Sequence, residues 1–175
     1  QIRELQNVLA QASECYTSTP NTYEEAHARL AYLKDVIENK GGHRYFYSKG
    51  KPLEREPDLH IAFRLVWFGS PSVVSPEVND GRGPADYKIA RSPADQTIVE
   101  MKLAKNTALK RNLQKQVEIY KAASGAKKAI KAILFFTRSE EVRVRKILKE
   151  LGLTGHPDVV LIDARGDNKP SGSKA

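Results

Sequence analysis

The sequence predicts an α/β fold in which a mixed central sheet is flanked by helices. Short runs of β-branched and apolar residues alternate with longer stretches whose apolar residues recur at helical spacing. Taken in order, the core reads as helix, three strands, helix and strand, a pattern typical of helices packed on one sheet. The 175 residues are enough for one such domain with a buried core.

Three regions are expected along the chain. Residues 1–42 would form an N-terminal helical hairpin, residues 43–165 the α/β domain, and residues 166–175, rich in Gly, Ser, Lys and Pro, a disordered tail. The hairpin either packs on the domain or is the end of an upstream domain. Because the sequence begins with Gln1 rather than Met, we expect it to be part of a longer protein.

The helical hairpin rests on two apolar-striped segments. Apolar residues recur at helical spacing over residues 2–15, and again after Thr22, where Glu25 would complete a capping box. Neither segment carries a catalytic motif.

Three consecutive aromatic residues, Tyr45 to Tyr47, stand among the basic residues Arg44, Lys49 and Lys51. Aromatic rings interleaved with cations can stack on bases and hold phosphates. The alternative is a short apolar segment that plugs the edge of the core.

The first helix of the core is predicted at residues 53–68. Its apolar surface comprises Leu59, Phe63 and Val66, widened by Ile61, Leu65 and Phe68. Its first turns carry the acidic residues Glu54, Glu56 and Asp58. Of these, Glu56 lies nearest the inward side and is the preferred candidate for a functional role. The alternative is that the acids only stabilise the start of the helix, where the helix dipole favours negative charge.

A first core strand is predicted at residues 72–78, and Glu77 falls just before the turn that follows it. As a carboxylate at a strand end, Glu77 either reaches the site described next or serves only the turn. Arg82, within that turn, is a candidate phosphate contact.

Two further strands, at residues 84–91 and 97–104, are joined by a segment of turn-forming residues and are expected to pair as a hairpin. Because side chains alternate along a strand, Glu100 and Lys102 share one face. Pairing of the strands would bring Asp86 beside Glu100. An acid and a base on a mostly apolar strand are costly to bury unless they are paired or bind something.

Two carboxylates and a lysine on one sheet face suit metal-assisted hydrolysis at phosphorus. Mg²⁺ prefers oxygen ligands and often takes one or two carboxylates together with waters and a substrate phosphate. The metal makes its bound water more acidic, and a nearby lysine can orient that water or stabilise the transition state. The alternative is that these are ordinary exposed strand residues.

A helix is predicted from the capping pair Asn106-Thr107 to about Ala123. Gln116 falls on its apolar stripe, one turn before Tyr120. A buried amide needs hydrogen-bond partners, and the polar groups of the neighbouring strand could supply them. Alternatively, Gln116 lies at the edge of the stripe and is solvated.

Together these motifs resemble the PD-(D/E)XK nuclease superfamily. An Asp ends the signature strand, a Glu-x-Lys motif lies on the next strand, and the Gln-x-x-x-Tyr motif of the following helix is similar to that of the RecB-like branch. The resemblance covers roughly residues 53–163 and implies an αβββαβ restriction-endonuclease-like core. One departure is Ala85, which separates the Pro from the Asp of the signature.

The resemblance also implies roles for individual residues. Asp86 and Glu100 would be metal ligands and Lys102 the catalytic lysine. Gln116 would support the catalytic geometry, and Tyr120 would support the helix or the substrate. In many members a Glu on the first helix completes the metal site, and here Glu56 is the preferred residue. The remaining candidates for that position are Glu54, Asp58 and Glu77.

The net charge of +8 is concentrated around the proposed site, because residues 101–131 are rich in lysine and contain Glu118 as their one acid. A basic surface beside carboxylates suits a phosphate backbone. The candidate contacts are Arg82, Lys105, Lys110, Arg111 and Lys115. A solvated helix face is the alternative explanation.

Several classes of protein do not fit the sequence. Cys15 is the one cysteine, which excludes an intrachain disulfide and favours a reducing, cytoplasmic compartment. The four histidines show no zinc-ligand spacing, and no apolar run approaches membrane length.

The sequence therefore predicts a Mg²⁺-dependent (or Mn²⁺-dependent) deoxyribonuclease, the effector domain of a larger prokaryotic protein of genome maintenance or antiphage defence. The alternative is a non-catalytic nucleic-acid-binding module of a larger complex. DNA is the expected substrate, with RNA as the second option. Endonuclease and exonuclease action, sequence preference and oligomeric state are left open.

Overall fold

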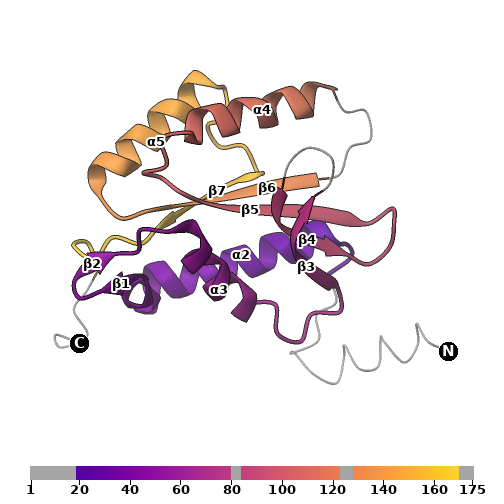
Figure 1. The fold of residues 1–175 in the computed structure, drawn as a ribbon, viewed down its shortest axis with the longest axis horizontal. Coiled ribbons are helices and arrows are strands. Elements are labelled where there is room, and N and C mark those ends of the chain that lie inside the picture. Colours follow the sequence, from indigo (N-terminus) through magenta and orange to yellow (C-terminus); the bar gives the residue numbers. More distant parts are fainter. Residues whose placement is uncertain (1–18, 80–83, 123–127, 170–175) are drawn as a thin grey trace.

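A computed structural model describes residues 19–79, 84–122 and 128–169, without the side chains at positions 57, 77–79, 84–85 and 116–122. Twelve elements follow one another along this part of the chain (Figure 1). They are α2 (Thr22–Asn39), the 3₁₀ helix η1 (Gly42–Phe46), β1 (Tyr47–Ser48), β2 (Lys51–Pro52), α3 (Glu56–Leu65), β3 (Val73–Asn79), β4 (Pro84–Ala90), β5 (Gln96–Leu103), α4 (Leu109–Ala122), β6 (Lys128–Phe135), α5 (Arg138–Glu150) and β7 (Val159–Asp163).

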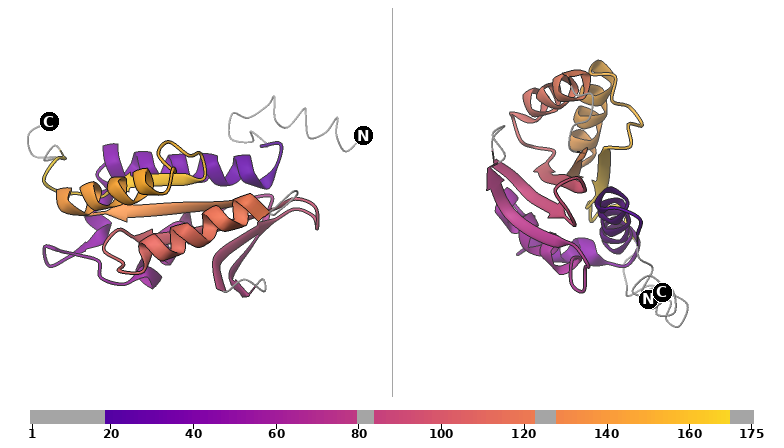
Figure 2. Two further views of the ribbon diagram at one scale, coloured as in Figure 1. Left: turned by 90° about the horizontal axis from the view of Figure 1, so that it is seen from above. Right: turned by 90° about the vertical axis from the view of Figure 1, so that its right-hand side faces the viewer.

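A five-stranded mixed sheet forms the centre, in the order β3-β4-β5-β6-β7. Strands β3, β4 and β5 pair antiparallel, whereas β5, β6 and β7 run parallel. Helices α2 and α3 cover one face, and α4 and α5 cover the other (Figures 1 and 2). The predicted fold class is confirmed, including the order helix, three strands, helix and strand from α3 to β6.

Alternation along β5 determines what each sheet face contacts. Its odd-numbered residues from Thr97 to Leu103 are buried, and Val99 and Met101 pack in a cluster with residues of α2 and α3. The even-numbered residues, including Glu100 and Lys102, are only partly buried and face the opposite way. On that side, α4, α5 and β6 build a separate apolar cluster.

Helix α3 is shorter than predicted, because it spans Glu56–Leu65 rather than residues 53–68. Leu59 and Phe63 are fully buried as expected, whereas Ile61 and Leu65 are 66% and 74% exposed. These exposed residues line a groove of about 740 Å³ between α2 and α3. The wider apolar surface predicted for this helix therefore exists, but Ile61 and Leu65 on its outer part are exposed to solvent.

Helix α2 packs against the sheet, and its residues Leu30 and Ile37 are fully buried in the same cluster as Val99. The predicted capping residue is wrong by one position. Asn21, not Thr22, is the N-cap, and its side chain accepts a hydrogen bond from the Glu24 N–H. Thr22 instead hydrogen-bonds Asp95 and Thr97. The helix predicted at residues 2–15 lies outside the described residues.

Glu25 does not complete a capping box, because its carboxylate is buried in a polar network. Ser70 and Ser72 donate hydrogen bonds to it through their hydroxyls, each at 2.6 Å. The guanidinium of Arg91, just beyond the end of β4, donates a third at 2.6 Å. This network ties α2 to the turn between β4 and β5.

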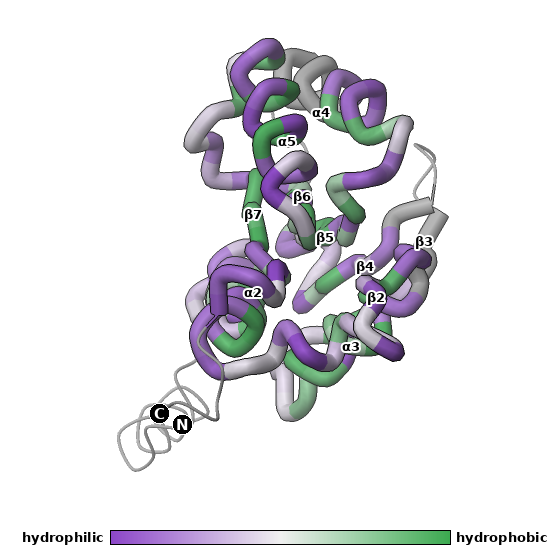
Figure 3. Tube along the Cα trace, turned by 90° about the vertical axis from the view of Figure 1, so that its left-hand side faces the viewer, coloured by the Kyte–Doolittle hydropathy of each residue, from purple (hydrophilic) through white to green (hydrophobic). Residues whose placement is uncertain are grey.

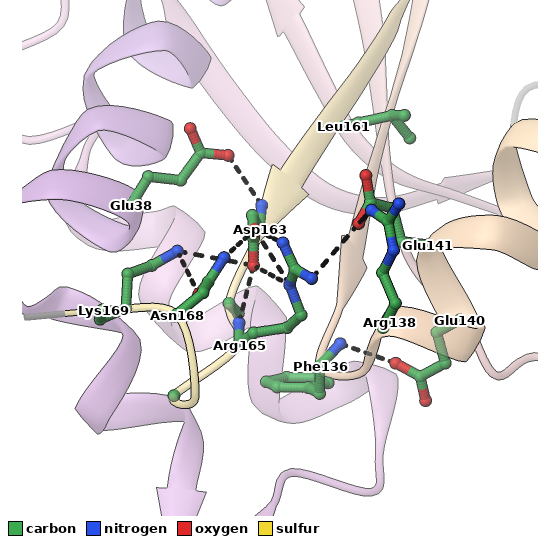
Figure 4. Close-up of polar contacts among 12 residues, drawn as sticks. Glu38, Phe136, Arg138, Glu140, Glu141, Leu161, Asp163, Arg165, Asn168 and Lys169 are labelled. Atoms are coloured by element: carbon green, nitrogen blue, oxygen red, sulfur yellow. Dashed lines mark hydrogen bonds and ion pairs between the residues drawn. The ribbon is translucent and has the colours of Figure 1, made fainter.

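The outer edge of β7 is covered by side chains of α2. Lys34 donates to the Leu161 carbonyl at 2.7 Å, and the Glu38 carboxylate accepts from the Asp163 N–H at 2.8 Å. Figure 4 shows this second contact, with Arg165 beside Asp163 at the end of the strand. Burial alone would raise the pKa of Asp163, but hydrogen bonds from Arg165 and its neighbours outweigh burial and lower that pKa.

Helix α5 begins at Arg138, and its N-cap is Thr137. The Thr137 side chain accepts from the Glu140 N–H at 3.1 Å, while the Glu140 carboxylate accepts from the Phe136 N–H. No helix in the described part of the chain is long and apolar enough to cross a membrane.

Candidate active site

The candidate site lies where β4 and β5 separate. The last paired residues of this antiparallel ladder are Tyr87 and Val99. Beyond them, the Asp86 carboxylate accepts a hydrogen bond from the Met101 N–H at 2.6 Å. A backbone donor that leaves a ladder in a partly buried place needs a new acceptor, and Asp86 supplies it. The carboxylate is thereby fixed at the open end of the strand pair.

Lys102 projects into this open end from the partly buried face of β5. Its Nζ lies 3.3 and 3.5 Å from the two Asp86 oxygens and 3.5 Å from Oε2 of Glu56. Burial alone would lower the pKa of Lys102, but the charges of Asp86, Glu56 and Glu100 outweigh burial and raise that pKa. The ammonium is therefore charged at neutral pH and lies between two carboxylates.

Glu56 enters the site from the first turn of α3. Its Oε1 accepts from the Leu103 N–H at 3.2 Å and from the Asn106 side-chain amide at 2.7 Å. Among the candidates on this helix, Glu56 is the one that reaches Lys102. Glu54 is exposed, and Asp58 lines the groove between α2 and α3.

Glu100 shares the Lys102 face of β5, as the alternation predicts, but its carboxylate has a partner of its own. Lys131 of β6 pairs with Glu100 across the parallel ladder, and its Nζ donates to Oε2 of Glu100 at 2.7 Å. The Lys131 side chain is only 6% exposed. Sequence reasoning missed this residue, although a lysine inside the apolar run of a central strand was a usable signal.

His60 is a second residue that sequence reasoning missed. It lies one turn after Glu56 on α3, and its Nε2 is 3.5 Å from Oδ2 of Asp86. This nitrogen is buried and has no hydrogen-bond partner in the described part of the chain. The i, i+4 spacing of Glu56 and His60, which places both on one side of a helix, could have pointed to it.

The donor atoms around Asp86 are of the chemical types that bind a hard divalent cation. Asp86, Glu56 and Glu100 offer carboxylate oxygens, the ligands that Mg²⁺ and Mn²⁺ prefer, and His60 offers a nitrogen. In the described part of the chain, no three such groups converge closely enough to hold a metal as they stand. Because the Lys102 ammonium lies between Asp86 and Glu56, a metal bound to both carboxylates would require that ammonium to shift.

The loop after β5 is held in place from two directions. The Asn106 amide binds Glu56, and its Oδ1 accepts from the Ala108 N–H at 2.8 Å, next to the start of α4. Arg143 of α5 donates to the carbonyls of Ala104 and Asn106, each at 3.0 Å. These contacts fix the direction in which Glu56 approaches the site.

The comparisons with known proteins bear on the part of the chain that contains this site. Residues 22–138 match a family model described as Domain of unknown function (DUF8371). The chain belongs to this family. No curated protein and no solved structure matches it. The matched segment runs from α2 through β6, so Glu56, Asp86, Lys102 and Lys131 all lie within the family domain.

The remaining predicted site residues fall into two groups. Four of them cannot be placed: Arg82 lies outside the described residues, as do the side chains of Glu77, Gln116 and Tyr120. The others are exposed basic residues of the family domain, at the start of α4 and before it: Lys105, Lys110, Arg111 and Lys115.

Two of those basic residues already have partners. Lys110 pairs with Glu150 of α5 at 2.7 Å, which neutralises part of the charge expected on α4. Lys105 donates to the Leu53 carbonyl at 3.3 Å, close to the start of α3.

Proposed function

We propose that this chain is a metal-dependent nuclease that hydrolyses phosphodiester bonds of DNA, acting as the effector domain of a larger prokaryotic protein of genome maintenance or antiphage defence. The supporting observation is the meeting of Asp86, Glu56 and Lys102, from three different elements, at the open end of the β4–β5 pair. Such a set joins metal-binding oxygens to a cation that can face a phosphate.

Each residue has a stated task in this proposal. Asp86 and Glu100, with Glu56, would hold Mg²⁺ or Mn²⁺, and the His60 ring nitrogen 3.5 Å from Asp86 could serve as a further ligand. The bound metal would acidify a water molecule and neutralise charge on the phosphate. Lys102 donates hydrogen bonds toward the attacked phosphate, where negative charge grows in the transition state.

A purely structural account explains only part of the geometry. Asp86 and Glu56 satisfy the N–H groups of Met101 and Leu103, which β4 no longer reaches. Neutral side chains such as Asn or Gln could accept those bonds equally well. A lysine that is 13% exposed, held between two carboxylates, is not needed for that purpose. The charged arrangement therefore favours a catalytic role.

The decisive experiment is a cleavage assay on single-stranded and duplex DNA with Mg²⁺ or Mn²⁺, using Asp86→Asn. This variant keeps an acceptor for the Met101 N–H but removes the charge that holds the metal. Cleavage is expected to fall more than about 100-fold, since loss of mere outer-sphere partners of a metal already costs 10- to 100-fold.

Asp35→Asn is the matched control, because Asp35 is also paired with a lysine but lies on the surface. It is expected to leave cleavage unchanged. If the native chain binds DNA without metal and never cleaves it, the non-catalytic binding module is the better description. If Asp86→Asn cleaves as fast as the native chain, the active site is elsewhere.

A further inference from the structure

The small hairpin formed by β1 and β2 has an unusual residue at its tip. Ser48 pairs with Lys51, so the loop consists of Lys49 and Gly50. Both have positive φ, 51° and 76°, as in the type I′ turn that joins tightly paired strands. Asn and Gly are the residues that favour this conformation, and Lys49 is the one non-glycine residue with positive φ in the described part of the chain. The hairpin turn therefore holds Lys49 in a left-handed backbone conformation that lysine rarely adopts.

The three aromatic residues before this hairpin do not behave alike. Phe46 is 4% exposed and belongs to the core. The Tyr47 hydroxyl donates to the Ala164 carbonyl at 3.0 Å and accepts from the Gly166 N–H. Tyr45, in contrast, is 88% exposed and lines the groove between α2 and α3. Plugging the core therefore explains Phe46 and Tyr47, but it does not explain the exposed ring of Tyr45.

The charged residues in the segment from Arg44 to Lys51 are all basic. Arg44, Lys49 and Lys51 are all exposed, and none of them pairs with a carboxylate in the described part of the chain. Exposed lysines elsewhere, such as Lys110 and Lys40, do have acidic partners. The hairpin therefore presents unneutralised cations beside an open aromatic ring.

The hairpin also lies close to the candidate active site. Pro52 ends β2 only four residues before Glu56, a separation of at most about 14 Å for an extended chain. The Leu53 N–H donates to the Phe46 carbonyl at 2.8 Å, and Lys105 donates to the Leu53 carbonyl. These bonds join the hairpin to the loop that follows β5. Viewed from the end of the molecule, β2 and α4 lie on opposite sides of β5 (Figure 3).

We propose that the surface formed by Arg44, Tyr45, Lys49 and Lys51 binds the single-stranded DNA that leads into the active site. Tyr45 stacks on a base, and the three cations contact phosphates. An exposed ring can stack only on a base whose face is free, which favours a single strand over a duplex. The choice of DNA as the ligand rests on the proposed nuclease function, whereas the binding mode rests on the hairpin itself.

The test is fluorescence anisotropy with a short labelled single-stranded DNA at several KCl concentrations, in the presence of EDTA so that no cleavage occurs. Tyr45→Ala is expected to weaken binding about 5- to 100-fold, the range for loss of one base–aromatic stack. Tyr45→Phe should retain the affinity, because the ring face remains. Phe68→Ala, which removes a ring that is 91% exposed just after α3 and does not line the groove beside Tyr45, is the matched control and should bind as the native chain does.

The lysine at the tip allows a charge test that does not disturb the turn. Lys49→Asn keeps a residue that accepts positive φ and removes only the charge. We expect the slope of log affinity against log salt to fall by about 0.7, the value for one phosphate contact on a single strand. Lys149→Gln, on the exposed side of α5, should leave the slope unchanged. Thermal unfolding of Lys49→Asn should be as cooperative as that of the native chain.

Two outcomes would overturn the inference: unchanged single-strand affinity of both Tyr45→Ala and Lys49→Asn, or an equal loss on duplex DNA with Tyr45→Ala. Because the assay contains no metal, its result is independent of catalysis. Hairpin-dependent binding without any cleavage in Mg²⁺ would retain the docking surface and reject the nuclease. Cleavage that requires Asp86 but neither Tyr45 nor Lys49 would support the nuclease and reject the docking surface.

Discussion

Each end of the β4–β5 strand pair carries carboxylates in contact with a cation. The two ends differ in the distances between these charged groups. At the turn end, Glu25 receives hydrogen bonds of 2.6 Å from Ser70, Ser72 and Arg91. At the open end, Lys102 reaches Asp86 and Glu56 only at 3.3–3.5 Å.

Under the proposed function, this difference distinguishes an ion pair that stabilises the fold from one that exchanges partners when substrate and metal bind. Glu25 keeps three partners at 2.6 Å and a fourth, Arg29, at 3.4 Å, and its side chain is only 4% exposed. All Lys102 contacts with carboxylates are 3.3 Å or longer, and Nε2 of His60 nearby has no hydrogen-bond partner among the described residues. The open end therefore has unused hydrogen-bonding capacity that the turn end lacks. Variants at the two ends should therefore affect cleavage and stability differently.

The largest effect is expected for Lys102→Met in the cleavage assay. Removing one preorganised donor to developing negative charge commonly lowers the rate 100- to 1000-fold. Stability should change much less, because Asp86 and Glu56 keep the N–H donors of Met101 and Leu103. Cleavage rates and urea unfolding curves measured on the same preparation give both quantities. Full activity in a stably folded Lys102→Met variant would show that Lys102 has no catalytic role.

The opposite pattern is expected for Glu25→Ala. Breaking a buried ion pair leaves an uncompensated charge, here Arg91, and costs about 3 kcal/mol of unfolding free energy. Cleavage by the folded fraction should be unchanged, because Glu25 lies at the other end of the strand pair. Urea unfolding gives the stability, with Asp35→Ala, which removes an exposed ion pair with Lys40, as the control expected to cost little. If Glu25→Ala lowers the free energy of unfolding no more than the control does, the Glu25 network is not needed for stability.

The smallest effect is expected in the pH dependence of stability. Burial alone would raise the pKa of Glu25, but hydrogen bonds from Ser70, Ser72 and Arg91 outweigh burial and lower that pKa below its ordinary 4.5. The unfolded chain therefore binds this proton first as pH falls, so the stabilisation present above pH 4.5 is lost progressively below it. Chemical unfolding of the native chain and Glu25→Gln between neutral and acidic pH measures the contribution. Identical pH profiles for the two proteins would contradict it.

The sequence was informative wherever local periodicity decides the answer. The two-residue period of a strand placed Glu100 and Lys102 on one face, and helical position singled out Glu56 among its acidic neighbours. The cap of α2 was misplaced by one residue, since Asn21 and Thr22 are both good capping residues and packing decides between them.

Contacts that depend on long-range packing were not predictable in this way. Lys131 meets Glu100 only because of the parallel register between β5 and β6. His60 meets Asp86 only because α3 lies across the open end of the β4–β5 pair. Neither the register nor the placement of α3 has a short-range signature in the sequence, so both residues became visible only in the folded chain.

The covering of β7 by α2 has a consequence for how this domain behaves at high concentration. An uncovered border strand invites a neighbouring molecule to extend the sheet. Here Lys34 and Glu38 occupy the backbone groups of Leu161 and Asp163 on one border. On the other border, β3 carries Pro76, which has no N–H to offer. Both borders of the sheet are thus obstructed against intermolecular strand addition, and crowded copies of this domain can stay separate.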